Sequence, residues 1–111
     1  MLPLSNLNDL FKALADPTRR KLLDLLRTRD GRSLQDLCRH FTLSRFAVMK
    51  HLGILKGAGL VTVRYEGRHT LHYLNAVPLQ RIADRWLSRY ARRIAPALLD
   101  LKDTLEQGDS R

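Results

Sequence analysis

The sequence contains a single cysteine, Cys38, among its 111 residues. One thiol cannot form a disulfide within the chain, and it cannot supply the several thiolates that a soft-metal site needs. The sequence also lacks any apolar run near the roughly 20 residues that cross a membrane, and its first residues lack the charged and apolar regions of a secretory signal. We therefore expect a cytoplasmic protein that does not enter a membrane.

The sequence also lacks the local motifs of enzymes and of common RNA-binding domains. It has no glycine-rich phosphate loop, no nucleophile elbow, no aromatic sheet motif and no GxxG clamp. Four histidines are present, but His69 and His72 lie three positions apart on a predicted strand, so their side chains point to opposite faces. We therefore expect no catalysis, no cofactor and no bound metal.

Positive charge is what the sequence has in excess. Twenty lysines and arginines against eleven acidic residues give a formal net charge of +9. In a chain of this size such an excess favours a polyanionic partner, although charge alone is also compatible with a merely soluble basic protein. The length fits a single domain spanning residues 1–111, so the positions of the basic residues must decide between the two interpretations.

Capping residues and apolar periodicity divide the chain into short elements. Each of four predicted helices begins at a serine or aspartate that can cap it. Counted from the capping residue, these helices span residues 5–14, 16–27, 33 to about 41, and 44–57. An alternating, β-favouring pattern on both sides of Gly67 predicts a hairpin within residues 60–74. Helical spacing returns over residues 78–106, where Pro96 interrupts it and leaves a short final helix.

This order of elements predicts a mostly α-helical winged helix-turn-helix domain with a small β-hairpin. The two helices within residues 33–57 are joined by a tight connection at Thr42-Leu43, which is typical of a helix-turn-helix. The hairpin over residues 60–74 follows directly, in the position of a wing.

The helix over residues 44–57 has the pattern of a DNA-reading helix. At about 100° per residue, Val48, Leu52 and Leu55 share one side, which can be buried. Taken singly, an apolar residue more often fills the core, but these three already define the buried side. The opposite side combines cations with apolar groups, which can contact guanine edges and thymine methyls in the major groove. The residues predicted to read bases are Arg45, Phe46, Met49 and Lys50.

Further polar and basic residues cluster beside that helix and at the tip of the predicted hairpin. For any one of them a solvated surface position is the simpler interpretation. Their clustering next to a reading helix favours contacts with the DNA backbone. The residues predicted to contact the backbone are Ser44, Lys56, Arg64, Arg68 and His69.

The assembled pattern resembles the arsenic-repressor-type (ArsR) family of winged-helix regulators. The resemblance is strong over about residues 7–75 and looser beyond. It is carried by LADPTRR at residues 14–20, by Ser44, Val48, His51 and Leu52 at their spacing, by AGLV at 58–61 and by EGR at 66–68.

The resemblance implies a transcriptional repressor that binds a pseudo-palindromic operator in double-stranded DNA as a homodimer. The dimer would form through the helices over residues 5–14 and 78–106, and the apolar stripe of the last helix supports such an interface. The residues predicted at this interface are Leu7, Leu10, Phe11, Trp86, Leu87, Tyr90 and Ile94.

The sequence departs from the metal-sensing members of that family. Ser33 and Gln35 occupy the positions of their Cys-x-Cys box, and the last helix has Asp84 but no histidine. A metal-responsive repressor and a winged-helix protein-interaction module remain as alternative functions. The sequence does not identify a small-molecule effector.

Overall fold

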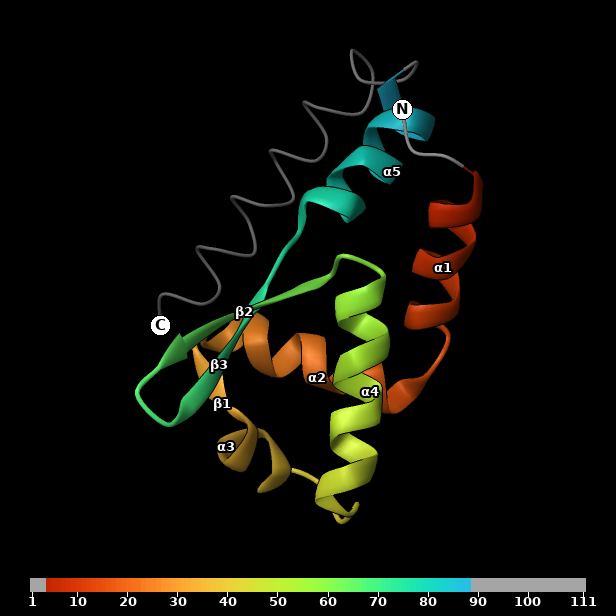
Figure 1. Cartoon of the computed structure of the whole chain (residues 1–111). Helices are drawn as coiled ribbons and strands as arrows, with labels where there is room; N and C mark the ends of the chain where they lie inside the picture. The colour runs from red at the N-terminus through yellow and green to blue at the C-terminus, as the bar shows by residue number, and fades with distance from the viewer. Residues whose placement is uncertain (1–3, 89–111) are drawn as a thin grey trace, which may run out of the picture. The chain divides into compact units, whose positions relative to one another are not determined.

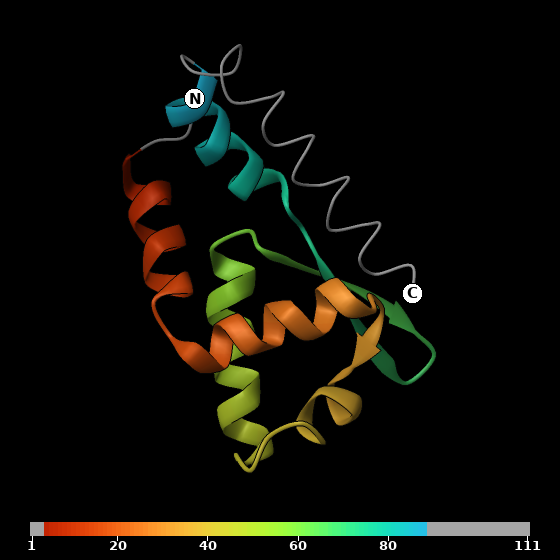
Figure 2. The same ribbon diagram turned by 180° about the vertical axis from the view of Figure 1, so that it is seen from behind.

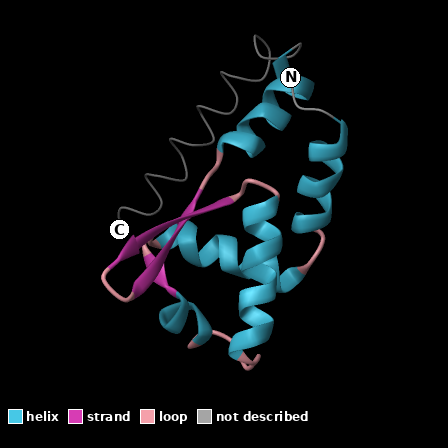
Figure 3. Cartoon of the chain, viewed as in Figure 1, coloured by secondary structure: helices cyan, strands magenta, loops and turns pink. Residues whose placement is uncertain are grey.

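The computed structural model describes the backbone of residues 4–88 and the side chains of residues 7–88. In chain order (Figures 1 and 3) the elements are α1 (Leu4–Leu14), α2 (Pro17–Thr28), β1 (Arg32–Ser33), α3 (Leu34–Cys38), α4 (Arg45–Gly57), β2 (Val61–Glu66), β3 (His69–Leu74) and α5 (Val77–Leu87). The residues before Leu79 form one compact unit, and the residues from Leu79 onward belong to a second. The predicted winged helix-turn-helix fold, mostly helical with a small hairpin, is confirmed.

Three of the four predicted helix caps are present. The side chains of Asp16, Ser33 and Ser44 accept hydrogen bonds from backbone N–H groups two or three residues later, at 3.2, 3.1 and 3.1 Å. These bonds satisfy donors that the first turn of a helix leaves without partners. The predicted cap at Ser5 is wrong, because α1 already includes Leu4, which continues the helical spacing of the apolar residues.

The predicted hairpin is confirmed and belongs to a small antiparallel sheet. β2 pairs with β3 from Val61 opposite Leu74 to Glu66 opposite His69, and Gly67 turns the chain with a φ of +58°. The left-handed region that this φ occupies favours glycine. β1, which the sequence did not predict, pairs with the other edge of β3 and gives the order β1-β3-β2.

One side of α4 packs into the hydrophobic core of the first unit. α1 packs on α2 and α4, while α2 also packs on α4 and β3 (Figure 2). The largest fully buried side chains are Leu10, Leu22, Leu26, Leu37, Val48, Leu55 and Leu60. Burying a leucine stabilises a fold by about 1.5–3 kcal/mol, and this packing leaves the opposite side of α4 exposed.

α5 begins at Val77, one residue before the predicted start, and none of its described side chains is buried. Tyr90, Ile94 and the rest of the predicted helix over residues 78–106 lie outside the described residues. Within residues 4–88, no helix has the length and apolar content needed to span a bilayer. The prediction of a single domain over the whole chain stays a prediction.

Candidate DNA-binding surface

The four residues predicted to read bases are all exposed on α4. Ser44 caps this helix, and the burial of Val48, Leu52 and Leu55 orients it. Phe46 is 70% exposed and Met49 is 51% exposed, so neither fills the core. Arg45 and Lys50 are exposed as well. The predicted division of α4 into a buried and an exposed side is therefore confirmed, while the contact of these residues with bases stays a prediction.

Two of these residues form a pair on the surface of α4. The Lys50 ammonium lies 5.6 Å from the centre of the Phe46 ring, a cation–π distance. An exposed phenylalanine beside a lysine presents an apolar face and a positive charge together. The edges of base pairs in the major groove offer matching groups, which are thymine methyls and guanine acceptors.

A groove of about 450 Å³ separates α4 from the hairpin. Arg45, Met49 and Lys56 line it from α4, and Arg68 and His69 line it from the hairpin. The groove thus brings together predicted base-reading and predicted backbone-contacting residues that are up to 24 positions apart in the sequence, between Arg45 and His69. This arrangement places basic residues on both walls of the groove, which Ser33, Leu34 and Gln35 also line.

Arg64 lies apart from this groove. Side chains alternate along a strand, so Arg64 is on the face opposite to its neighbour Tyr65, which lines the groove. The Arg64 guanidinium instead lies 5.4 Å from the centre of the Tyr73 ring. Tyr65 is a groove residue that the sequence did not single out, and it is largely exposed.

Gly53 is a second groove residue to which the sequence assigned no role. It lies inside α4, on the exposed side, and a Cβ added there would meet no atom within 4 Å. Its φ is not positive, so the backbone does not require glycine. A glycine inside a helix costs about 0.5–1 kcal/mol relative to alanine. Neither the helix nor its described surroundings explains this residue.

His72 forms part of the groove wall and is 5% exposed. Its Nδ1 lies 2.9 Å from the carbonyl oxygen of Arg32, which can only accept, so Nδ1 carries the proton. Burial lowers the pKa of His72, the bond to the carbonyl works in the opposite direction, and the charge of Lys56 lowers the pKa further. His69 and His72 are three positions apart on β3, and both contribute to the lining of the groove.

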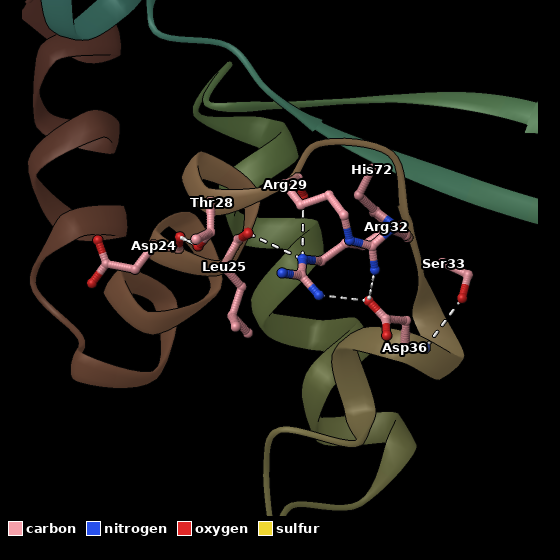
Figure 4. A network of polar contacts seen from close by, with 8 residues as sticks. All are labelled: Asp24, Leu25, Thr28, Arg29, Arg32, Ser33, Asp36 and His72. Atoms are coloured by element: carbon pink, nitrogen blue, oxygen red, sulfur yellow. Dashed lines mark hydrogen bonds and ion pairs between the residues drawn. The ribbon is translucent and has the colours of Figure 1, made fainter. Parts of the chain in front are cut away.

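Arg32 connects β1 to the helices on either side (Figure 4). Its Nε donates to the carbonyl oxygens of Leu25 at 3.0 Å and Arg29 at 3.2 Å, and its Nη1 donates to Oδ2 of Asp36 at 2.9 Å. The Arg32 hydrogen bond is the largest cause that holds the pKa of Asp36 below its usual value. Together with the His72 bond, these contacts join the end of α2, the start of α3 and the hairpin.

Arg19 connects α1 to α4 in a similar way. Its Nε and Nη2 donate to the carbonyl oxygens of Ala13 at 2.8 Å and Lys12 at 2.9 Å, at the end of α1. Its Nη1 lies 3.3 Å from Nδ1 of His51 on α4. His51 is thus a partly buried residue with a polar partner on another helix. The LADPTRR segment thus has a structural role here that the sequence did not reveal.

The predicted dimer-interface residues that the structure describes divide into a buried group and an exposed group. Leu10 is 1% exposed and Leu7 is buried as well, so both are core residues of their own chain. This burial corrects the prediction that they face a partner, whereas Phe11, the third predicted interface residue on α1, is 43% exposed. Trp86 and Leu87 are about half exposed.

Cys38 is partly buried at the end of α3. Over residues 4–88, no three histidine, cysteine or acidic side chains come together in a way that could hold a metal ion.

Known proteins similar in sequence to this chain agree with the helix-turn-helix fold described above. A family model described as a helix-turn-helix domain matches residues 14–64. The transcriptional repressor SdpR of Bacillus subtilis is 40% identical over 74 residues, which cover 67% of this chain and 81% of SdpR.

Solved structures also resemble this chain. An ArsR-like transcriptional regulator from Rhodococcus sp. RHA1 has 31% identity and a TM-score of 0.68, with 93% of each chain covered. The cadmium metal-sensor CmtR from Mycobacterium tuberculosis has 39% identity and a TM-score of 0.54, over 72% of this chain and 81% of CmtR. With its exposed α4 and adjoining wing, the chain belongs to the ArsR family and is a DNA-binding transcriptional regulator.

Proposed function

We propose that this regulator is a repressor that binds a pseudo-palindromic operator as a homodimer. The observation that carries the proposal is the exposed side of α4, where cations and apolar groups adjoin a groove with basic residues on both walls. The similarity to a protein named as a repressor supports the direction of regulation. A dimer bound at a promoter represses by excluding polymerase.

In this proposal the two parts of the surface have different tasks. α4 enters the major groove, where Arg45 and Lys50 pair with guanine O6 and N7, while Phe46 and Met49 contact thymine methyls. Phosphate contacts position the protein without reading sequence. The residues proposed for these contacts are Ser44, Lys56, Arg64, Arg68 and His69.

The proposal is tested by selecting bound duplexes from a random library with the purified protein. Arg45→Ala and Lys50→Ala should each reduce the preference for the selected duplex over random DNA by about 1–3 kcal/mol, because each loses a base contact. Arg68→Ala is the matched control. It should weaken all duplexes alike and lower the slope of log K against log salt by about 0.9.

Two results would contradict these assignments. If Arg45→Ala weakened selected and random duplexes equally, Arg45 would contact the backbone and not a base. If the wild-type protein selected no duplex at all, the protein-interaction alternative would be favoured over the repressor.

The homodimer is proposed to form through apolar side chains on α1 and α5, among them Phe11, Trp86 and Leu87. These three are exposed in the single chain. A twofold dimer would place its two copies of α4 about 34 Å apart, one turn of DNA. We expect Trp86→Ala to shift the protein toward monomers in sedimentation velocity, because it removes a large apolar contact. An unchanged sedimentation profile would exclude Trp86 from the interface.

We also propose that DNA binding requires no metal and that the protein has no catalytic role. The similarity to a cadmium sensor is the observation that favours a metal-responsive repressor instead. Against it, one cysteine per chain gives a soft metal few thiolates. Titration of cadmium into the complex with the selected duplex distinguishes metal-independent from metal-responsive DNA binding. Only a metal-responsive protein would change its affinity for the duplex at stoichiometric cadmium.

A further inference from the structure

The described fold does not explain why position 53 is a glycine. It lies inside α4 with an ordinary helical backbone, and a Cβ there would meet nothing within 4 Å in the described structure. Glycine destabilises a helix interior relative to alanine, so a free position of this kind gains stability from any small side chain. Nothing among the described residues therefore accounts for the missing side chain, and a ligand that approaches the helix closely would account for it.

The surroundings of Gly53 indicate what that requirement is. Gly53 lines the groove between α4 and the hairpin, together with the basic residues Arg45, Lys56 and Arg68. A channel with positive walls and a bare stretch of helix suits an anionic chain that must approach the helix closely. The sugar-phosphate backbone of DNA has this chemistry, and basic side chains beside it supply the positioning contacts.

We propose that Gly53 is the point of closest approach between α4 and the DNA backbone. One strand lies in the groove over Gly53, with its phosphates toward Lys56 and Arg68. A side chain at position 53 holds the duplex away from α4, and this displacement also weakens the contacts of Arg45 and Met49 with bases. The inference deepens the proposed function and rests on it.

Gly57 provides a matched control within the same helix. It is also exposed, and a Cβ added there would likewise meet nothing within 4 Å. It is the last residue of α4 and does not line the groove. Because helix ends fray, a glycine at the last position costs a helix less than one in its interior, so Gly57 needs no explanation from a ligand.

The experiment compares Gly53→Ala, Gly53→Leu and Gly57→Ala with the wild-type protein. Thermal unfolding is measured alongside affinity for the selected duplex and for a random duplex of equal length, at one salt concentration. Gly53→Ala should raise the Tm by roughly 2–8 °C and yet bind the selected duplex about 5–10-fold more weakly. Gly53→Leu should weaken binding by on the order of 100-fold, the loss expected when a base contact is also displaced. Gly57→Ala should leave the affinity unchanged.

The outcomes distinguish a failure of the inference about Gly53 from a failure of the proposed DNA-binding function. If the wild-type protein prefers no duplex, the proposed function fails, and this inference fails with it. If the wild-type protein binds its selected duplex and both Gly53 variants bind it equally well, only the inference about Gly53 is overturned. It is also overturned if Gly57→Ala weakens binding as much as Gly53→Ala does, because the effect would then not belong to the groove.

Discussion

Replacing Arg32 with methionine is expected to lower the free energy of unfolding by about 3 kcal/mol at pH 7. The Arg32 side chain is 10% exposed and donates to two backbone carbonyls and one carboxylate. Methionine retains the apolar stem but leaves these acceptors without their donor. Removing one member of a largely buried, charge-assisted set costs about 3–5 kcal/mol when nothing replaces it. The lower end applies here, because Asp36 keeps its contact with Arg29.

Urea unfolding of the wild-type protein, Arg32→Met and Arg29→Met measures this effect. Arg29 donates to the same Asp36 oxygen at 3.1 Å, but its side chain is 60% exposed. An exposed pair of this kind contributes about 1 kcal/mol or less, so Arg29→Met is the matched control. Equal losses for both variants would show that the two carbonyl contacts of Arg32 contribute nothing.

The loss of stability caused by Arg32→Met should depend on pH in the acid range. The folded pKa of Asp36 lies below its ordinary value of 3.8, chiefly because of the Arg32 hydrogen bond. The stabilisation from this carboxylate is therefore complete above about pH 4 and is lost as the pH falls through the lower folded pKa. The stability difference between the wild-type protein and Arg32→Met should narrow over that acid range. A difference that widened there would contradict this assignment to Asp36.

Arg32 matters for function because its contacts connect the wing to the helices α2 and α3. Its side chain joins the end of α2 to α3, and its carbonyl accepts the Nδ1 proton of His72 on β3. β3 pairs with β2 to form the wing. The distance between the wing and α4, and hence the width of the groove, therefore depends on contacts outside the predicted DNA-reading residues.

The parts of the fold that the sequence predicts are those that depend on near neighbours. Ser33 and Ser44 cap helices within three residues, and Gly67 turns a hairpin whose strands alternate on both sides. The exposed side of α4 follows from helical spacing once Val48 and Leu55 are taken as buried. In each case the signal and the structure lie within a few positions of each other.

The features that the sequence did not reveal depend on contacts between distant residues. Arg32 and His72 are 40 positions apart, and Arg19 and His51 are 32 apart. A two-residue strand such as β1 is too short to show alternation. Helical spacing also shows that Leu10 lies on an apolar face, but it cannot tell a face that covers the core from one that meets a partner.

The second large effect is expected at Arg19, whose replacement by methionine should lower the free energy of unfolding by about 2–4 kcal/mol. The side chain is 14% exposed. It donates to the carbonyls of Lys12 and Ala13 at the end of α1, the first of which also accepts from the Ala15 N–H, and it reaches His51 on α4. Arg19→Lys should recover only part of the loss, because lysine lacks the planar fork that serves several acceptors.

Arg20 offers the control for Arg19, because it lies next in the same motif and donates to one exposed carbonyl, that of Leu14, at 2.7 Å. Arg20→Met should cost less than about 1 kcal/mol in urea unfolding. Since Arg19 points into the junction of helices, folded Arg19→Met should bind the selected duplex as tightly as the wild-type protein at a temperature well below its Tm. A variant of unchanged stability that had lost DNA affinity would instead make the LADPTRR segment a DNA contact.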